Sequence, residues 1–313
     1  MVLESVISAY TLAALSLEGA RSSERQMMAS GWLLVVASLA FSYATPIESM
    51  HPIRPLGSLF HPSICASVAG QGAIHVFCMR RAVKMATARM GDSALRAVVR
   101  FQRKARAGEL VDDPGDEDDP FAFVTSMWAT PFLPNLLNTA VFLVETSQMV
   151  AVLFVNYKGR PWMKGLTENH ALFLSLFASI GGICLCAWSL IPEVNNALHL
   201  SPFPDDQFAY EILYLVLASL FGTLLWDRLC TLLFAPRIFR AQLTEFKKIT
   251  FVDLQPILVT LLKVVGVMVV LSTGNILMYG GAFWAYRQHK KKAAADDKLV
   301  KQRILRGAPE AAD

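Results

Sequence analysis

Charged side chains are scarce in this sequence, and long stretches contain none at all. Asp, Glu, Lys and Arg make up 17% of the 313 residues, whereas 54% are hydrophobic, and the mean hydropathy is +0.42. Soluble domains are closer to about a quarter charged, so this composition excludes an ordinary soluble protein. The surplus apolar side chains have to face lipid, and the sequence therefore predicts an integral membrane protein.

Cysteine is also sparse, and its placement excludes a disulfide framework. All five cysteines fall inside apolar runs, where they are typical of small buried hydrophobic residues. The features of a signal peptide are missing as well, because no basic region precedes the first apolar run and no small-x-small cleavage site follows it. The first run is therefore interpreted as part of the membrane domain.

Six apolar runs approach the length of about 20 residues that a helix needs to cross a bilayer core of roughly 30 Å. They are Leu3 to Leu17, Met27 to Ala44, Leu59 to Met79, Leu136 to Tyr157, Ala171 to Ile191 and Phe208 to Phe234. The first is only 15 residues long and begins beside Met1, so we interpret it as a truncated span. A seventh stretch, Pro256 to Tyr286, is interrupted by Lys263 and predicts either one tilted helix or a broken hairpin.

The predicted fold class is therefore all-α, a polytopic transmembrane bundle of six to seven spans. We expect a membrane domain over 1–240, with a charged loop insertion at 80–130. Residues 241–313 form an extra apolar segment with a basic tail.

Charge within the insertion is strongly divided. The segment 80–106 carries nine Lys or Arg residues at helical spacing, and 112–119 carries six Asp or Glu residues around a Pro-Gly pair. The basic half predicts a helix, which is either an amphipathic helix on anionic lipid or a solvated loop element, and the acidic half is typical of disorder. Nucleic-acid binding has no support, since no recognised module accompanies the basic residues.

Membrane orientation is ambiguous from the basic residues. The loops 158–170 and 228–248 carry three and five Lys or Arg residues, whereas 192–207 carries none, which predicts that 192–207 lies outside. The basic segment 80–106 then falls on the outside too, against the positive-inside rule.

The strongest motif signal lies between Leu136 and His170. It contains Asn138-Thr139, Gln148-Met149, the turn sequence NYKGRPWM at 156–163, and Glu168-Asn169. This pattern resembles the eighth membrane helix and following loop of the type-five, subgroup-A P-type ATPases, the endoplasmic-reticulum dislocases of mistargeted transmembrane helices. Trp162 stands where that family usually has Phe.

Other segments resemble the same family in the same order along the chain. Residues 7–19 resemble the end of its fifth helix, 26–31 its sixth, 54–75 the entry and body of its seventh, and Asp227-Arg228 the close of its tenth. The phosphorylation motif Asp-Lys-Thr-Gly-Thr, the actuator loop and the nucleotide-binding domain of that family are absent from this sequence. We therefore expect no ATP hydrolysis by this chain alone and no cofactor in it, with ATP and Mg²⁺ bound only in a complete ATPase.

Polar groups within the apolar runs are the candidate site residues, because they are costly in a membrane. The first two runs offer few carboxylates, which is unfavourable for a metal-ion site but compatible with a groove for an apolar polypeptide helix, as the resemblance implies. The groove candidates are Gln71, His75, Asn138, Glu145, Gln148 and Asn156. Each has an alternative interpretation as an interhelical hydrogen bond. Glu145, Gln148 and Asn156 are expected on roughly one helix face.

The family-motif turn contributes Tyr157, Gly159, Pro161 and Met163. No metal site is predicted, because His61, Cys65, His75 and Cys78 are too spread along one helix to share an ion.

The resemblance implies the carboxyl-terminal membrane portion of an ATP-driven translocase in the endoplasmic-reticulum membrane. Its expected partners are the lipid bilayer, a hydrophobic polypeptide substrate and a missing amino-terminal catalytic half. A start in mid-helix leads us to expect a fragment or one half of a split protein. The alternatives are a standalone membrane scaffold or regulator derived from such a fragment, and an unrelated multi-span transporter. The transporter is disfavoured because the sequence has no paired half-helices.

Overall fold

The computed structural model describes residues 2–43, 45–47, 51–109, 131–166 and 168–247, with a few positions between 255 and 288. The chain forms two units, Met1–Thr250 and Phe251–Asp313. The few described residues of the second unit are helical. Whether 256–286 is one span or a hairpin lies outside the described residues.

Helices make up the first unit, and the all-α fold class is confirmed. They are α1 (Val2–Leu17), α2 (Glu24–Ser42), α3 (Pro62–Arg106), α5 (Leu136–Asn156), α6 (His170–Ala187), α7 (Pro192–Ala197), α8 (Asp206–Phe234) and α9 (Pro236–Lys247). Within the described ranges the only extended pairing is an isolated bridge between Pro46 and Met163. Four helices, α3, α5, α6 and α8, are long and apolar enough to cross a membrane, and α1 is a shorter apolar helix.

Polar caps fix where several of these helices begin. The side chain of Asn135 accepts a hydrogen bond from the backbone N–H of Asn138 at 2.9 Å, and Asp205 accepts one from Phe208 at 2.7 Å. Ser23 forms a capping box with Gln26 at the start of α2. Such caps satisfy backbone donors that the helix cannot, and each stabilises by about 1 kcal/mol.

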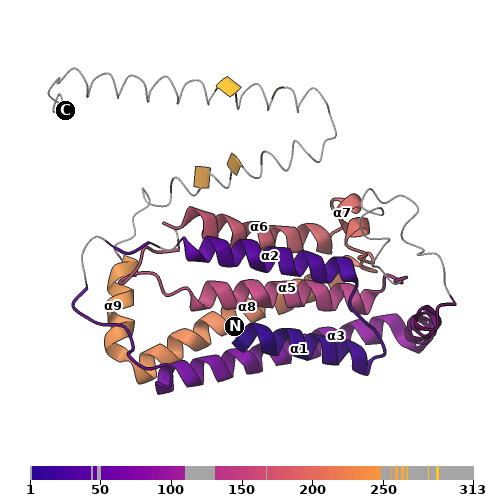
Figure 1. Ribbon diagram of the computed structural model, residues 1–313, viewed down its shortest axis with the longest axis horizontal. Helices are drawn as coiled ribbons and strands as arrows, with labels where there is room; N and C mark the ends of the chain where they lie inside the picture. Colours follow the sequence, from indigo (N-terminus) through magenta and orange to yellow (C-terminus); the bar gives the residue numbers. More distant parts are fainter. Residues whose placement is uncertain are drawn as a thin grey trace. The chain divides into compact units, whose positions relative to one another are not determined.

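Helix α5 is the centre of the bundle. It contacts α1, α2, α3, α6 and α8, and in Figure 1 it runs between the α2–α6 pair and the α1–α3 pair. Within its most apolar window 89% of the residues are buried, against 33% in α3, α6 and α8. The other spans therefore face the lipid along much of their length, whereas α5 is enclosed by protein.

Helix α3 changes direction at Gly91, whose backbone has φ +72° and is not helical. Beyond this point the helix is seen nearly end-on in Figure 1, so it turns across the end of the bundle. It packs there through Val98 and Gln102, which are buried. The prediction that the basic segment 80–106 is helical is confirmed.

The basic part of α3 lies at one end of the bundle and the α5–α6 turn at the other. Arg89 forms ion pairs with Asp205 and Glu211, which lie at the start of α8. The α5–α6 turn instead meets the end of α8, where Lys158 pairs with Asp227. Basic residues therefore occur at both ends of the bundle, so the positive-inside rule does not assign one end to the inside.

Candidate functional site

A cavity lies in the wedge between α1 and α2. α1 packs on α3 and α5, whereas α2 packs on α5 and α6, so the two helices diverge across α5. The space between them has a volume of about 250 Å³. It is lined by Ser8, Leu12, Leu15, Ser22, Gln26, Met27, Ser30, Gly31, Leu34, Asn138, Val141, Phe142, Glu145 and Met149.

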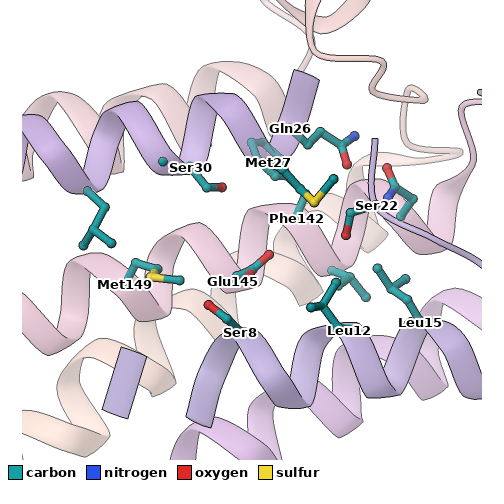
Figure 2. A pocket seen from close by; sticks show the side chains of 14 residues that line it. Ser8, Leu12, Leu15, Ser22, Gln26, Met27, Ser30, Phe142, Glu145 and Met149 are labelled. Atoms are coloured by element: carbon teal, nitrogen blue, oxygen red, sulfur yellow. The ribbon is translucent and has the colours of Figure 1, made fainter. Parts of the chain in front are cut away.

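Apolar side chains line most of the wedge, and its polar lining residues are Ser8, Ser22, Gln26, Ser30, Asn138 and Glu145. Figure 2 shows Glu145 on α5 between Ser8 of α1 and Ser30 of α2, with Met149 beside it and Met27 above. Methionine side chains are flexible and fit irregular apolar partners. A surface of this kind suits an apolar ligand that carries a few polar groups.

Several polar atoms of the wedge have no partner among the described residues. They are the hydroxyl of Ser30 and the side-chain oxygen of Asn138. The carboxylate of Glu145 likewise makes no hydrogen bond or ion pair with the described residues. The amide nitrogen of Asn138 is used, because it donates to the backbone oxygen of Arg21 at 3.0 Å. Unpaired polar groups at membrane depth are costly, so their collection in one cavity makes the wedge a candidate binding site.

The other four predicted groove residues do not line the wedge. Gln71, His75, Gln148 and Asn156 lie between α3, α5 and α8. The Asn156 amide donates to the Gln71 side-chain oxygen at 3.2 Å, and the Gln148 amide donates to the backbone oxygen of His75 at 2.8 Å. The expectation that Glu145 shares a face with Gln148 and Asn156 is wrong, because Glu145 faces α1 and α2 while the other two face α3.

This polar chain continues to a charged pair at the end of α8. Gln71 donates to the hydroxyl of Ser67 at 2.8 Å, and Ser67 donates to the carboxylate of Asp227 at 2.7 Å. The Lys158 ammonium donates to both carboxylate oxygens of Asp227, at 2.8 and 2.7 Å. Sequence reasoning missed the roles of Ser67 and Lys158; the available signal was Asp227, an acid near the end of an apolar run.

Burial lowers the pKa of Lys158, and the neighbouring Asp227 carboxylate acts in the opposite direction. Desolvation penalises the ammonium, whereas the opposite charge favours it.

The motif turn after α5 is held by its own polar groups. The Tyr157 hydroxyl donates to the backbone oxygen of Lys164 at 2.8 Å, and Gly159 has φ +45°. A Cβ at Gly159 would lie 3.2 Å from the Cα of Gly165, so the turn requires glycine there for both reasons. Pro161 follows a cis peptide bond.

An ion pair closes this turn internally, and two contacts connect it to the segment between α2 and α3. Arg160 donates to both carboxylate oxygens of Glu168, at 2.8 and 2.7 Å, and this guanidinium holds the pKa of Glu168 below its usual range. Trp162 donates to the backbone oxygen of Ile53 at 2.8 Å, and Met163 pairs with Pro46. The turn therefore anchors the segment between α2 and α3.

Within the described ranges no group of three or more His, Cys, Asp or Glu side chains could hold a metal ion. His61 instead caps α3 by accepting from the backbone N–H of Ser63 at 3.2 Å, and a ring nitrogen of His75 lies 3.0 Å from the Ser219 hydroxyl.

Comparison with known proteins gives consistent relatives, although no family model matches the sequence. The endoplasmic reticulum transmembrane helix translocase of Aspergillus fumigatus is 29% identical over 209 residues, which are 66% of this chain and 14% of that protein. The corresponding translocase of Saccharomyces cerevisiae is 26% identical over 223 residues, 71% of this chain and 16% of that protein. The probable manganese-transporting ATPase PDR2 of Arabidopsis thaliana is 28% identical over 203 residues, 65% and 15% respectively.

These similarities confirm the resemblance to the type-five, subgroup-A P-type ATPases. The chain spans only 14–16% of the length of these relatives and corresponds to a membrane portion of such a protein. Together with the four apolar helices, the relatives confirm the prediction of an integral membrane protein of the endoplasmic reticulum.

Proposed function

We propose that this chain is the carboxyl-terminal membrane portion of an ATP-driven translocase and that the wedge between α1 and α2 contacts its substrate, an apolar polypeptide helix. Two of the relatives are named as translocases of transmembrane helices. The observation that carries the proposal is the wedge itself, a largely apolar cavity on the central helix with Glu145 at its middle, whose carboxylate has no partner among the described residues.

The physical argument rests on what such a cavity favours. An apolar helix fills the wedge by van der Waals packing, the main source of helix association in lipid. A polar side chain on that helix gains a partner in Glu145, Ser30 or Asn138, which the bilayer core does not offer. Among the described lining residues Glu145 is the one carboxylate, so a hard metal ion would depend mostly on neutral oxygens such as those of Ser30 and Asn138, which disfavours ion transport through the wedge.

Site-specific photo-crosslinking tests the substrate contact. A photoreactive amino acid replaces Leu12 of α1 or Met27 of α2, and the full chain is co-translated into microsomes with a single-span test protein. Both positions line the wedge, so we expect adducts with the test helix. The matched control is Phe221 of α8, which is 59% exposed and lies outside the wedge. Equal adduct yields at all three positions would contradict the proposal.

The proposed catalytic partner is a separate matter with its own test. An immunoblot of native membranes, using an antibody against Asp112 to Asp119, measures the size of the protein that carries this sequence. A band far above 34.5 kDa indicates a complete ATPase, to which ATP and Mg²⁺ binding then belong. A band at 34.5 kDa means that the ATP-driven function requires a second chain, or that the scaffold alternative holds if no such chain co-purifies.

A further inference from the structure

The end of α8 carries a charged group that the wedge does not use. Asp227 is buried, with 4% of its side chain exposed, and lies near the end of the mostly apolar helix α8. A buried carboxylate is retained only when a positive charge and hydrogen-bond donors compensate its desolvation. The groups around Asp227 therefore identify the positive charge that compensates its carboxylate.

The two carboxylate oxygens of Asp227 and the backbone oxygen of Val155 all lie near the ammonium of Lys158. The Lys158 ammonium lies 2.8 and 2.7 Å from the two Asp227 oxygens and 3.4 Å from the backbone oxygen of Val155. Ser67 donates to the carboxylate from the α3 side at 2.7 Å, so the acid is fixed in orientation. Three oxygens from two elements thus surround one positively charged nitrogen.

Close packing of α3 against α8 makes this geometry possible. Trp226, next to Asp227, donates from its indole nitrogen to the backbone oxygen of Ala66 at 2.9 Å. The indole lies so close to Gly70 that a Cβ there would be 1.8 Å from its nitrogen. Because α3 has no side chain at this point, Ser67 reaches Asp227 from one turn earlier in the helix.

The ammonium itself comes from outside the helices. Lys158 follows α5 by two residues, in the turn toward α6. Its side chain is 40% exposed, so it enters the site from the end of the bundle. Arg228, the neighbouring cation in the sequence, is directed elsewhere and donates to Gln242 of α9 at 2.8 Å.

We propose that Asp227 and the Val155 carbonyl form a binding site for a singly charged cation, and that this chain fills the site permanently with its own Lys158 ammonium. The site is independent of the wedge and of the proposed substrate. Its consequence is that the end of α5, the following turn and α8 are fixed together without a diffusible ion. Removal of the ammonium should therefore create a site for a small free cation.

Chemical rescue tests the proposal on the purified full chain. Lys158→Ala should lower the melting temperature by roughly 5 °C or more, because it leaves Asp227 buried and unpaired. Ammonium or methylammonium chloride should restore at least half of this loss, whereas tetramethylammonium chloride at equal ionic strength should not, because its methyl groups block hydrogen bonding. Potassium chloride is the third salt, because the potassium ion carries the same charge without N–H donors. Rescue by potassium would show that the site recognises charge alone, and rescue by ammonium without potassium would show that it requires N–H donors.

Two variants keep the result interpretable. Lys158→Ala with Asp227→Asn lacks the carboxylate and should show no rescue, and Lys164→Ala, an exposed lysine of the same turn, should behave like the unmodified chain. Failure of every small cation to stabilise Lys158→Ala more than this double variant would overturn the proposal.

A second measurement does not depend on the alanine variant folding. Acetylation of lysines in native membranes, followed by mass spectrometry, should modify Lys158 at least several-fold more slowly than Lys164. Asp227→Asn should remove most of the difference. Equal rates in the unmodified chain would show that the ammonium is not seated on Asp227.

Discussion

The side-chain amide of Gln148 donates to the backbone oxygen of His75 at 2.8 Å, which joins the middle of α5 to the first third of α3. Gln148 is 1% exposed, so solvent has little access to replace this bond. We expect Gln148→Met, which keeps the side-chain length but loses the donor, to destabilise the bundle by roughly 0.6–1.7 kcal/mol. Thermal unfolding of the full chain in detergent measures the loss.

Gln207→Met provides the matched control. Gln207 is exposed at the start of α8, and among the described residues its amide donates only to Glu211, at 3.3 Å. The same change there should leave the unfolding temperature nearly unaltered. A loss of equal size at both positions would mean that the interhelical bond contributes nothing specific.

Gly70 is the position where α3 tolerates no side chain. A Cβ there would lie 1.8 to 2.5 Å from three atoms of the Trp226 indole. Gly70→Ala should therefore displace the ring, break its hydrogen bond to Ala66 and cost roughly 1–3 kcal/mol, as overpacking does elsewhere. The melting temperature and the tryptophan emission spectrum should both change.

A glycine in another span, where an added methyl group meets no described neighbour, serves as the control. It distinguishes the clash with Trp226 from a general effect of replacing glycine by alanine in a helix. At Gly181 of α6 an added Cβ would meet no atom within 4 Å among the described residues, so Gly181→Ala should be tolerated. Trp226→Leu combined with Gly70→Ala should cost less than the sum of the two single changes, because the clash is then relieved. Additive losses would contradict a direct contact.

The sequence predicted the helices well because membrane spans depend on local composition. The runs at 136–157 and 171–191 both have the length and apolarity of a span, and both form helices. Composition alone could not show that the first is enclosed and the second faces lipid. The usable signal was the distribution of polar residues, since α5 carries Asn138, Thr146 and Gln148 on different faces, which no lipid-facing helix could accommodate.

The site was predicted only in part, for a geometric reason. Asn138 and Glu145 were identified as polar groups at membrane depth, and the structure places them in the wedge. Their neighbours Ser8 and Ser30 come from α1 and α2, whose divergence depends on packing between distant segments. A single sequence has no signal for that divergence, and serine is too common in membrane helices to indicate it.

The Arg160–Glu168 pair should make the stability of the α5–α6 turn depend on pH. Because the pKa of Glu168 is held below its usual value in the folded chain, the pair stabilises above about pH 4.3, the ordinary glutamate pKa. This contribution is lost as the pH falls through the lower, folded pKa. Glu168→Gln should cost about 0.5–1 kcal/mol at pH 7, since the pair is partly exposed, and progressively less in acid.

Glu193→Gln is the comparison for the pH series. Glu193 is exposed in α7 and makes no ion pair within the described ranges, so its replacement removes a carboxylate without breaking an ion pair. Limited proteolysis at the α5–α6 turn reports the local effect. A constant difference between Glu168→Gln and the unmodified chain from pH 7 to 4 would show that the ion pair does not act there.

Glu145 should show opposite effects on stability and on substrate contact. Its carboxylate has no partner among the described residues of the wedge, so Glu145→Leu removes a polar group from an apolar cavity and should raise the melting temperature of the full chain. Glu211→Leu, which removes a partner of Arg89, should not raise it. Because Glu145 is the proposed partner of polar substrate groups, the same Leu variant should also lose crosslinking from Leu12 to test helices that carry a polar residue, while crosslinking to fully apolar helices is retained. Loss of stability in Glu145→Leu would mean that the carboxylate has a structural partner and that the wedge is not a site held open for a ligand.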